Sequence, residues 1–166
     1  MVGYFFDKEG ERREWEWIEG RDIVTVLPVL DNGDIILIRN YRIPVGKYVY
    51  DIPTGVIDAE DKSPELAARR ELIEETGYQT NSLLSLPTYA HSPGNSSSIV
   101  YPFIATKLDL VSKLHGDVTE DIELVVLSIN EVVAMYLKND NLFNIRVIAL
   151  LHLARLKGLC EPEQKI

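Results

Sequence analysis

A chain of 166 residues, of which 46% are hydrophobic, is long enough for one domain with a proper core and short for two. Its single cysteine, Cys160, excludes an internal disulfide, and a net charge of −9 argues against general binding to nucleic acid. No apolar run could cross a membrane, and the first residues, M-V-G-Y-F-F-D-K-E, have no basic segment before their apolar ones. We therefore expect one cytoplasmic domain over residues 1–166, with neither nucleic acid nor membrane as its partner.

The segment 1–20 predicts a β-hairpin that extends this domain. Residues 4–18 alternate weakly, and D-K-E-G at 7–10 is a turn signal between the two arms. Trp15 and Trp17 then share one face of the hairpin. Because two exposed tryptophans are costly, we expect the hairpin to pack on the body of the protein or on a second subunit.

Two apolar, β-branched strands come next, at 22–30 and 34–39. D-N-G at 31–33 lies between them and predicts that they form a hairpin. An extended stretch interrupted by proline and glycine, residues 39–55, then leads into the central part of the chain.

Residues 63–77 carry start and stop signals for one helix. Ser63 is a good N-cap, Pro64 occupies the first helical position, and Gly77 suits the left-handed residue that ends a helix. The apolar residues that we expect to pack against a sheet are Leu66, Leu72 and Ile73.

Three glutamates share the other side of this helix. At about 100° per residue, Glu71, Glu74 and Glu75 fall within one arc, and Arg70 is placed to meet Glu74. Clustered carboxylates without nearby thiolate or imidazole suit a hard divalent ion, Mg²⁺ or Mn²⁺. A bare E-x-x-E-E is more often a solvated acidic face. The surrounding residues are therefore needed to distinguish a metal site from such a face.

The remainder of the chain predicts two strands and two helices separated by polar loops. The loops are 89–98 and 109–121, the strands 99–106 and 122–128, and the helices 129–138 and 142–158.

Residues 70–78, R-E-L-I-E-E-T-G-Y, resemble the Nudix box, the signature of hydrolases that act on nucleoside diphosphates linked to another moiety. That box reads Gly, five residues, Glu, seven residues, then Arg-Glu-hydrophobic-x-Glu-Glu-x-Gly-hydrophobic. The matching residues are Arg70, Glu71, Leu72, Glu74, Glu75, Gly77 and Tyr78. Gly55 lies one residue too far upstream, and either Asp61 or Lys62 fills the first Glu position, so we expect a longer loop and a retained site.

This resemblance extends over about residues 21–158 and implies an α+β fold, a Nudix-type α/β/α sandwich with a mixed β-sheet, here with an N-terminal β-hairpin extension. It implies that Glu71, Glu75 and the backbone carbonyl of Thr54 bind Mg²⁺, with Mn²⁺ also possible. Glu74 would assist them, and Arg70 would orient them.

The pattern R-N-Y-R followed by D-I-P-T-G, within residues 39–55, resembles the ADP-ribose pyrophosphatase branch of the family, where R-Q-Y-R and E-L-P-A-G are typical. By that resemblance Arg42, with Arg39 beside it in the motif, would contact the diphosphate or the terminal sugar phosphate. Asp51 would stand for an acidic substrate-binding residue. Taken singly, each arginine is an ordinary surface charge.

The S-P-G motif at 92–94 marks the same branch, because Pro93 lies sixteen residues after Gly77. Pro93 and Gly94 are therefore candidates for substrate binding. Many members carry an acidic residue shortly after this motif, where this chain has only serines at 96–98. Their presence weakens the case for ADP-ribose as the sole substrate.

The branch also places a glutamate on the loop before the last strand, where it binds metal or activates water. T-E-D-I-E-L offers Glu120 on the loop and Glu123 at the start of the strand. We assign Glu120 as the metal-binding catalytic residue and keep Glu123 as its alternative.

The expected function is Mg²⁺-dependent hydrolysis of the diphosphate bond of ADP-ribose or a related nucleoside diphosphate sugar, giving a nucleoside monophosphate and a sugar phosphate. The alternatives are another nucleotide substrate, such as GDP-mannose or a dinucleoside polyphosphate, and a non-catalytic sensor with a Nudix fold. The complete set of glutamates argues against the sensor.

N-terminal strands in this branch commonly cross to a partner subunit, so the resemblance implies a homodimer in which Trp17 stacks on the nucleotide base. The alternative is that Trp15 and Trp17 cover the sheet of their own subunit.

Overall fold

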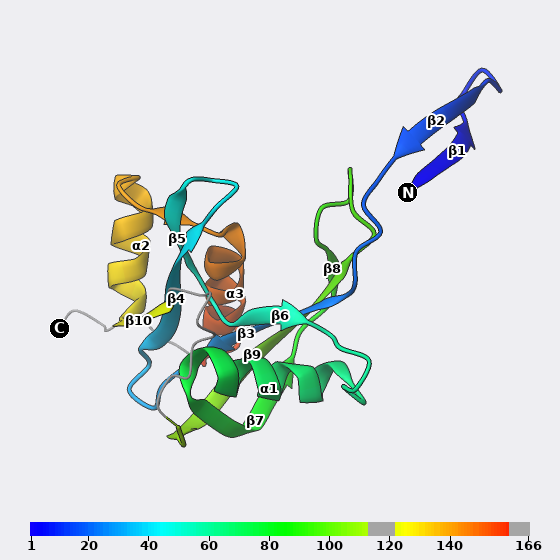
Figure 1. The fold of residues 1–166 in the computed structure, drawn as a ribbon. Helices are drawn as coiled ribbons and strands as arrows, with labels where there is room; N and C mark the ends of the chain where they lie inside the picture. Colours follow the sequence, from blue (N-terminus) through cyan, green and yellow to red (C-terminus); the bar gives the residue numbers. More distant parts are fainter. Residues whose placement is uncertain (113–121, 160–166) are drawn as a thin grey trace.

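The structure, a computed structural model, describes residues 1–112 and 122–159 (Figure 1). The described strands are β1 (Val2–Phe6), β2 (Arg12–Glu16), β3 (Ile23–Pro28), β4 (Ile35–Arg42), β5 (Lys47–Asp51), β6 (Thr54–Val56), β7 (Tyr78–Ser85), β8 (Tyr89–Ala90), β9 (Ile99–Leu110), β10 (Ile122–Leu127) and β11 (Leu142–Phe143). The described helices are α1 (Pro64–Thr76), α2 (Ile129–Lys138) and α3 (Ile145–Leu156). None of these helices is both long enough and apolar enough to span a membrane.

The strands of the described ranges form two larger sheets and one separate hairpin. The β3 sheet has the order β6-β3-β9-β7, with β8 paired to β9, and the β4 sheet has the order β10-β4-β5-β11. The β3–β9 and β5–β11 pairs are parallel, and the other pairs are antiparallel. The expected α+β fold with mixed sheets is confirmed.

The hairpin expected between β3 and β4 forms as a turn but not as a strand pair. Leu30 N–H donates to the carbonyl of Asp34 at 2.8 Å, and Gly33 has the positive φ of 86° that the turn requires. Beyond an isolated bridge between Val29 and Ile35, the two strands separate into different sheets. Periodicity could not foresee this, because the separation depends on the later strands β9 and β5.

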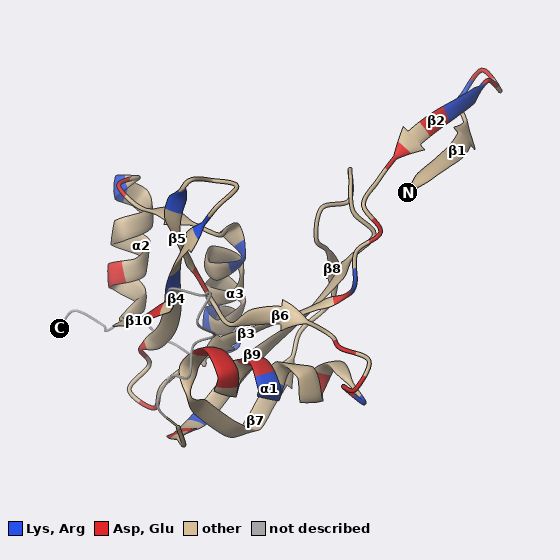
Figure 2. Cartoon of the chain, viewed as in Figure 1, with Lys and Arg blue, Asp and Glu red and all other residues tan. Residues whose placement is uncertain are grey.

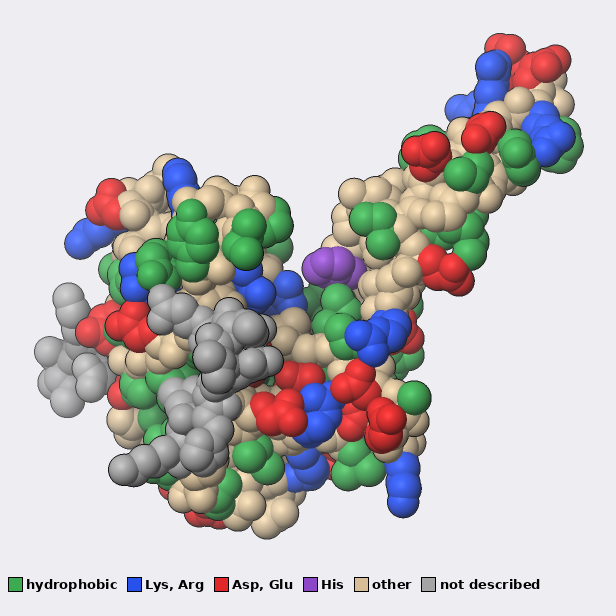
Figure 3. Space-filling model, viewed as in Figure 1, with side chains coloured by type: hydrophobic (Ala, Val, Ile, Leu, Met, Phe, Trp, Pro, Cys, Tyr) green, Lys and Arg blue, Asp and Glu red, His purple; other side chains and the backbone are tan. Residues whose placement is uncertain are grey.

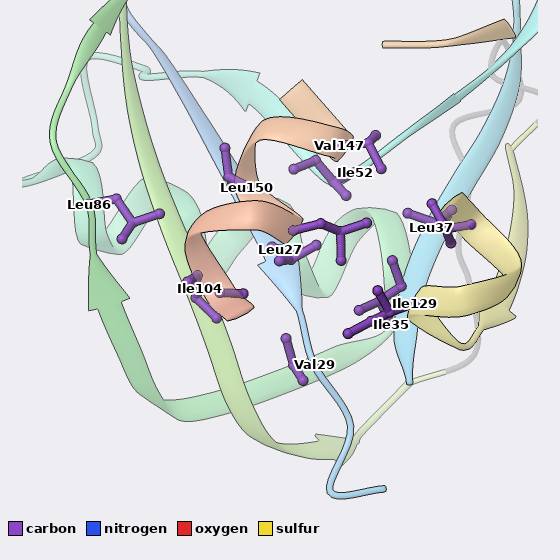
Figure 4. Close-up of a cluster of buried hydrophobic side chains, with 13 residues drawn as sticks. Leu27, Val29, Ile35, Leu37, Ile52, Leu86, Ile104, Ile129, Val147 and Leu150 are labelled. Carbon is purple, nitrogen blue, oxygen red and sulfur yellow. The ribbon is translucent and has the colours of Figure 1, made fainter. Parts of the chain in front are cut away.

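The two faces of β3 belong to different hydrophobic clusters, because side chains alternate along a strand. Leu27 and Val29 pack with Ile35, Leu37 and residues of α2 and α3 (Figure 4). Val24 and Val26 pack against α1 on the opposite face. The β3 sheet is therefore covered by helices on both sides, as a sandwich requires.

The helix α1 begins and ends where its signals predict. The Ser63 side chain accepts a hydrogen bond from the N–H of Leu66, and Gly77 has a φ of 75°. The prediction of which residues of α1 are buried is wrong in part, because Leu66 and Ile73 are 47% and 37% exposed. The residues that pack inward with Leu72 include the small Ala67 and Ala68, which lets the helix lie close to β3. This rotation also turns the first glutamate of the acidic face inward.

The helix expected at 142–158 begins later, at Ile145. Leu142 and Phe143 instead pair with β5 as the short strand β11, and Asn144 caps the helix by accepting from the N–H of Arg146. The pairing of β11 with β5 places Asn144 and Arg146 beside the end of β5.

The N-terminal hairpin is confirmed and forms an arm that projects from the body together with the loop after β8 (Figure 1). Ile18 N–H donates to the carbonyl of Asn95 at 2.8 Å, and Trp15 Nε1 donates to the carbonyl of Gly94 at 3.3 Å. The Trp17 ring lies against Gly3, where an added Cβ would be 2.4 Å from the ring. Within the chain, the hairpin thus packs on this loop and covers neither of the two larger sheets.

Candidate functional site

The Arg70 guanidinium is the centre of an acidic cluster on α1 and the loop before it. Its nitrogens lie 2.6 Å from Glu71, 2.8 Å from Asp61 and 2.9 Å from Glu74, and Nη2 donates to the carbonyl of Val56 at 3.0 Å. The expected Arg70–Glu74 contact is therefore present. Figure 2 shows acidic and basic residues next to one another along α1 and further acidic residues on the loop before it.

In the longer loop between β6 and α1, Asp61 and Lys62 were both candidates for the first Glu position of the box. Asp61 is the one that contacts Arg70. Asp61 accepts two hydrogen bonds from Arg70, which lowers the pKa of its carboxyl group. Asp58 also lies 3.5 Å from Arg70 and pairs with Arg21 at 2.8 Å. Four carboxylates thus lie around a single guanidinium, and the excess negative charge favours an additional cation.

Glu71 is buried against bare backbone. It is 8% exposed, and a Cβ built on Gly55 would lie 1.9 Å from its carboxylate. Burial raises the pKa of Glu71, Arg70 opposes that rise, and the charges of Glu74 and Asp58 add to it. Only glycine at position 55 leaves room for this carboxylate.

Glu75 contacts Thr54, the residue before Gly55 on β6. The N–H of Thr54 donates to Glu75 Oε2 at 2.8 Å, so the third box glutamate lies beside β6. The Thr54 hydroxyl donates to the carbonyl of Ile52 at 2.8 Å and lies 2.9 Å from the hydroxyl of Thr25. These contacts hold the Thr54 backbone where Glu71 and Glu75 approach β6.

Among the described residues, no three histidine, cysteine or acidic side chains are arranged around a common point as a finished metal site. Arg70 and the Thr54 N–H hold Glu71 and Glu75 instead. The available donors nevertheless fit a hard ion, because they are oxygens: the Glu71 carboxylate lies against Gly55, and the Glu75 carboxylate lies beside the backbone of Thr54. Glu71, Glu75 and the Thr54 carbonyl could hold Mg²⁺ or Mn²⁺.

A second, basic group lies around the buried carboxylate of Asp51, which is 1% exposed. Its oxygens accept from Ile52 N–H at 2.9 Å and Asn144 Nδ2 at 3.1 Å, and they lie 3.4 Å from Arg146 and 3.7 Å from Arg42. Burial raises the pKa of Asp51, and Arg146 is the strongest influence that lowers it. The structure brings the two candidates Arg42 and Asp51 together.

Sequence reasoning missed Arg146, although its position was unusual. A cation in the first turn of a helix is unfavourable, because the macrodipole is positive there. The buried Asp51 offsets that cost. Arg146 also joins the two groups, since its Nη1 donates to the Thr54 hydroxyl at 3.2 Å. It lines a cavity of about 300 Å³, whose walls are Tyr89, His91, Asn144, Ile145, Arg146 and Ala149.

Arg39 and Glu123 lie apart from this group. Arg39 Nη1 donates to Glu123 Oε2 at 2.7 Å, and its guanidinium carbon is 4.1 Å from the ring centroid of Tyr48. Arg39 and Arg42 are three residues apart on β4 and so project from opposite faces of the sheet. Glu120, the preferred catalytic candidate, lies outside the described residues.

The remaining candidates, Pro93, Gly94 and Trp17, lie on the arm. Pro93 and Gly94 are exposed, and Gly94 contacts Trp15. Trp17 lines a cavity of about 440 Å³ with Met1, Val2, Glu16, Ile18 and Asn95. In Figure 1 the hairpin projects away from α1, so this chain alone does not bring Trp17 to the acidic cluster.

The acidic and basic groups form one continuous, polarised site. Thr54 links them, because its N–H contacts Glu75 and its hydroxyl contacts Arg146. In Figure 3 acidic side chains gather over α1 and the loop before it, below a hollow between the body and the arm, and basic side chains lie above them. Such a site can bind a cation and an anion side by side.

Comparison with known proteins identifies the family of the chain. The sequence model of the NUDIX domain matches residues 20–151. An ADP-ribose pyrophosphatase of Bacillus subtilis is 32% identical over 123 residues, which are 74% of this chain and 66% of that protein. A GDP-mannose pyrophosphatase of Yersinia enterocolitica is 34% identical over 137 residues, 77% of this chain and 70% of that protein.

Among solved structures, the crystal structure of an ADP compounds hydrolase superposes with a TM-score of 0.79 at 30% identity. The match covers 93% of this chain and 84% of that one.

Replacing Gly55 by alanine is expected to lower the affinity for Mn²⁺ by about tenfold or more, because the new Cβ would displace the Glu71 carboxylate. Calorimetric titration with Mn²⁺ measures this. The matched control for Mn²⁺ affinity is Gly94→Ala on the loop after β8, where an added Cβ meets nothing within 4 Å and the backbone φ is not in the left-handed region. Unchanged Mn²⁺ affinity in Gly55→Ala would show that Glu71 does not hold the ion.

Proposed function

Because the chain belongs to the Nudix family of hydrolases, we propose that it hydrolyses the diphosphate bond of a nucleoside diphosphate sugar, with ADP-ribose as the first candidate. The observation that carries the proposal is the polarised site, in which an acidic face and a basic group meet at Thr54. A diphosphate with its divalent cation has the same distribution of charge. The Bacillus subtilis relative, named an ADP-ribose pyrophosphatase, supports this choice of substrate.

Each group then has a defined task. Glu71, Glu75 and the Thr54 carbonyl would hold a divalent ion, which when bound would neutralise charge at the phosphates and lower the pKa of a bound water. Arg70 keeps Glu71 and Glu74 in place through its hydrogen bonds.

The substrate side and the proton transfer use other residues. Arg42 binds the diphosphate and is held near it by Asp51. Glu120 orients the attacking water and takes its proton. Attack on one phosphorus releases a nucleoside monophosphate and a sugar phosphate.

GDP-mannose is the second candidate substrate, supported by the Yersinia relative, which is named a GDP-mannose pyrophosphatase. A turnover screen of ADP-ribose, GDP-mannose and a dinucleoside polyphosphate with Mg²⁺ or Mn²⁺ distinguishes the candidates. A sensor that binds without cleaving would show affinity but no turnover. The presence of Glu71, Glu74 and Glu75 argues against that outcome.

Glu75→Gln is expected to reduce ADP-ribose turnover more than about 100-fold, since a direct metal ligand matters at least as much as its outer-shell partners. Steady-state kinetics over a range of Mg²⁺ concentrations measures the loss. Glu65→Gln is the control on the same helix, because Glu65 is exposed and pairs with Arg69. Near-normal activity of Glu75→Gln at low Mg²⁺ would contradict the assignment.

Glu120→Gln is expected to lower kcat by roughly 10²- to 10⁴-fold with a small change in KM, because a lost general base acts on the chemical step. Glu123→Gln should be milder, since Glu123 is exposed and pairs with Arg39. Parallel kinetics of the two variants provides the comparison. The reverse ranking would assign the base to Glu123 and leave Glu120 as a surface charge.

We also propose a homodimer in which the arm contacts the second subunit. A two-stranded hairpin is marginally stable by itself, and this one exposes large apolar side chains, including Phe6 at 73%, Tyr4 at 59% and Trp15 at 53%. A second copy of the chain is the most common partner, because most oligomers are symmetric homo-oligomers and dimers are the commonest of these. Trp17 would then stack on the base bound by that copy, for about 1–3 kcal/mol.

Deleting residues 1–20 is expected to shift the protein toward monomer in sedimentation velocity and to weaken AMP binding. The body should keep its melting temperature within a few degrees, because the hairpin forms a separate sheet and covers neither of the larger ones. A truncated protein that remained dimeric and bound AMP normally would leave the tryptophans as packing residues of the arm.

A further inference from the structure

We infer that Arg146 is a second phosphate-binding arginine, and that the cavity beside it is the subsite for the sugar phosphate half of the substrate. The inference rests on the proposed function and assigns one end of the substrate to a place in the fold. It starts from the cavity of about 300 Å³ between β8 and α3, which contains Arg146 in its wall.

The charges around Asp51 leave one positive charge in excess. Asp51 is shared by Arg42 and Arg146, so a single buried carboxylate faces two guanidinium groups. The Arg146 side chain is only 11% exposed, and a buried cation without its full complement of anions is unfavourable. An anion entering from the cavity would balance this charge.

Arg146 keeps donors for such an anion. Its Nε lies 3.4 Å from Asp51, and its Nη1 donates to the Thr54 hydroxyl. Within the described ranges Nη2 makes no hydrogen bond, although a guanidinium carries five N–H donors. The planar arrangement of these donors matches the oxygens of a phosphate.

The Thr54 contact sets the position of that phosphate relative to the metal-binding side. The Thr54 N–H holds Glu75, and its hydroxyl accepts from Arg146, so both ends of one residue are engaged. A phosphate bound by Arg146 would therefore lie next to the acidic face of α1. This is where the phosphate of the departing sugar should be.

The other walls of the cavity suit a sugar better than a nucleobase or a further charge. Tyr89, Ile145 and Ala149 present apolar surface to the C–H groups of a sugar ring, while His91 and Asn144 can exchange hydrogen bonds with hydroxyls. The volume leaves room for a pentose or hexose. The base is then directed to the other side of the diphosphate.

The test separates the two halves of the substrate by measuring the binding of each product. Isothermal titration with ribose 5-phosphate and with AMP, at constant Mg²⁺, is performed on the full chain and on four variants. Arg146→Met removes the charge, Arg146→Lys keeps it without the fork, and Ala149→Phe fills the cavity from an exposed position. Arg155→Met, in the last turn of α3, is the matched control.

Arg146→Met should weaken ribose 5-phosphate about 10- to 100-fold, as expected for a lost charge-assisted hydrogen bond, and change AMP less than about threefold. Arg146→Lys should recover part of the loss, Ala149→Phe should reproduce it, and Arg155→Met should change neither ligand. If Arg146→Met does not fold, Arg146→Lys and Ala149→Phe decide the question by the same criterion.

Equal weakening of both ligands, or of neither, would make Arg146 a residue that only holds Asp51 and would overturn the inference. So would failure of the unchanged protein to bind ribose 5-phosphate. A protein that bound ribose 5-phosphate through Arg146 but hydrolysed no nucleotide sugar would retain the subsite and refute the proposed hydrolysis.

Discussion

The site depends on one constraint, the close approach of α1 to the backbone of β6. The small residues Ala67 and Ala68 let the helix lie against β3, and the absence of a side chain at Gly55 lets the Glu71 carboxylate reach β6. Arg70 then ties the helix to the β6 backbone at Val56 and to the preceding loop at Asp61. Without this approach the carboxylates would be an ordinary solvated helix face.

The features that the sequence predicted well are those determined by neighbouring residues. Ser63 and Gly77 act within one turn of α1, and the Arg70–Glu74 contact spans four positions. The features that it missed depend on distant partners. Leu66 and Ile73 are exposed because the sheet selects which stripe of the helix is buried, and Arg146 is meaningful only beside Asp51, far away in the chain.

An acidic protein with an anionic substrate needs local charge of the opposite sign, and the chain provides it by separating its charges. The net charge is −9, yet Asp51 is the shared counterion of Arg42 and Arg146. Their field is strongest where burial excludes water, so a short basic surface can outweigh a distant excess of carboxylates. The acidic face of α1 complements it by attracting the cation that accompanies a diphosphate.

The loop between β6 and α1 affects how well a sequence pattern can identify proteins of this kind. Asp58 and Asp61 close a turn on themselves, with Asp58 N–H donating to the Asp61 carboxylate at 3.0 Å and Asp61 N–H donating to the Asp58 carbonyl at 3.1 Å. The longer loop closes on itself in this turn, while Gly55 lies against the Glu71 carboxylate of α1. A pattern search with rigid spacing between the glycine and the arginine would discard this chain, although the three-dimensional neighbours are intact. Spacing across a self-closing turn is thus a weaker criterion of kinship than the residues that meet on either side of it.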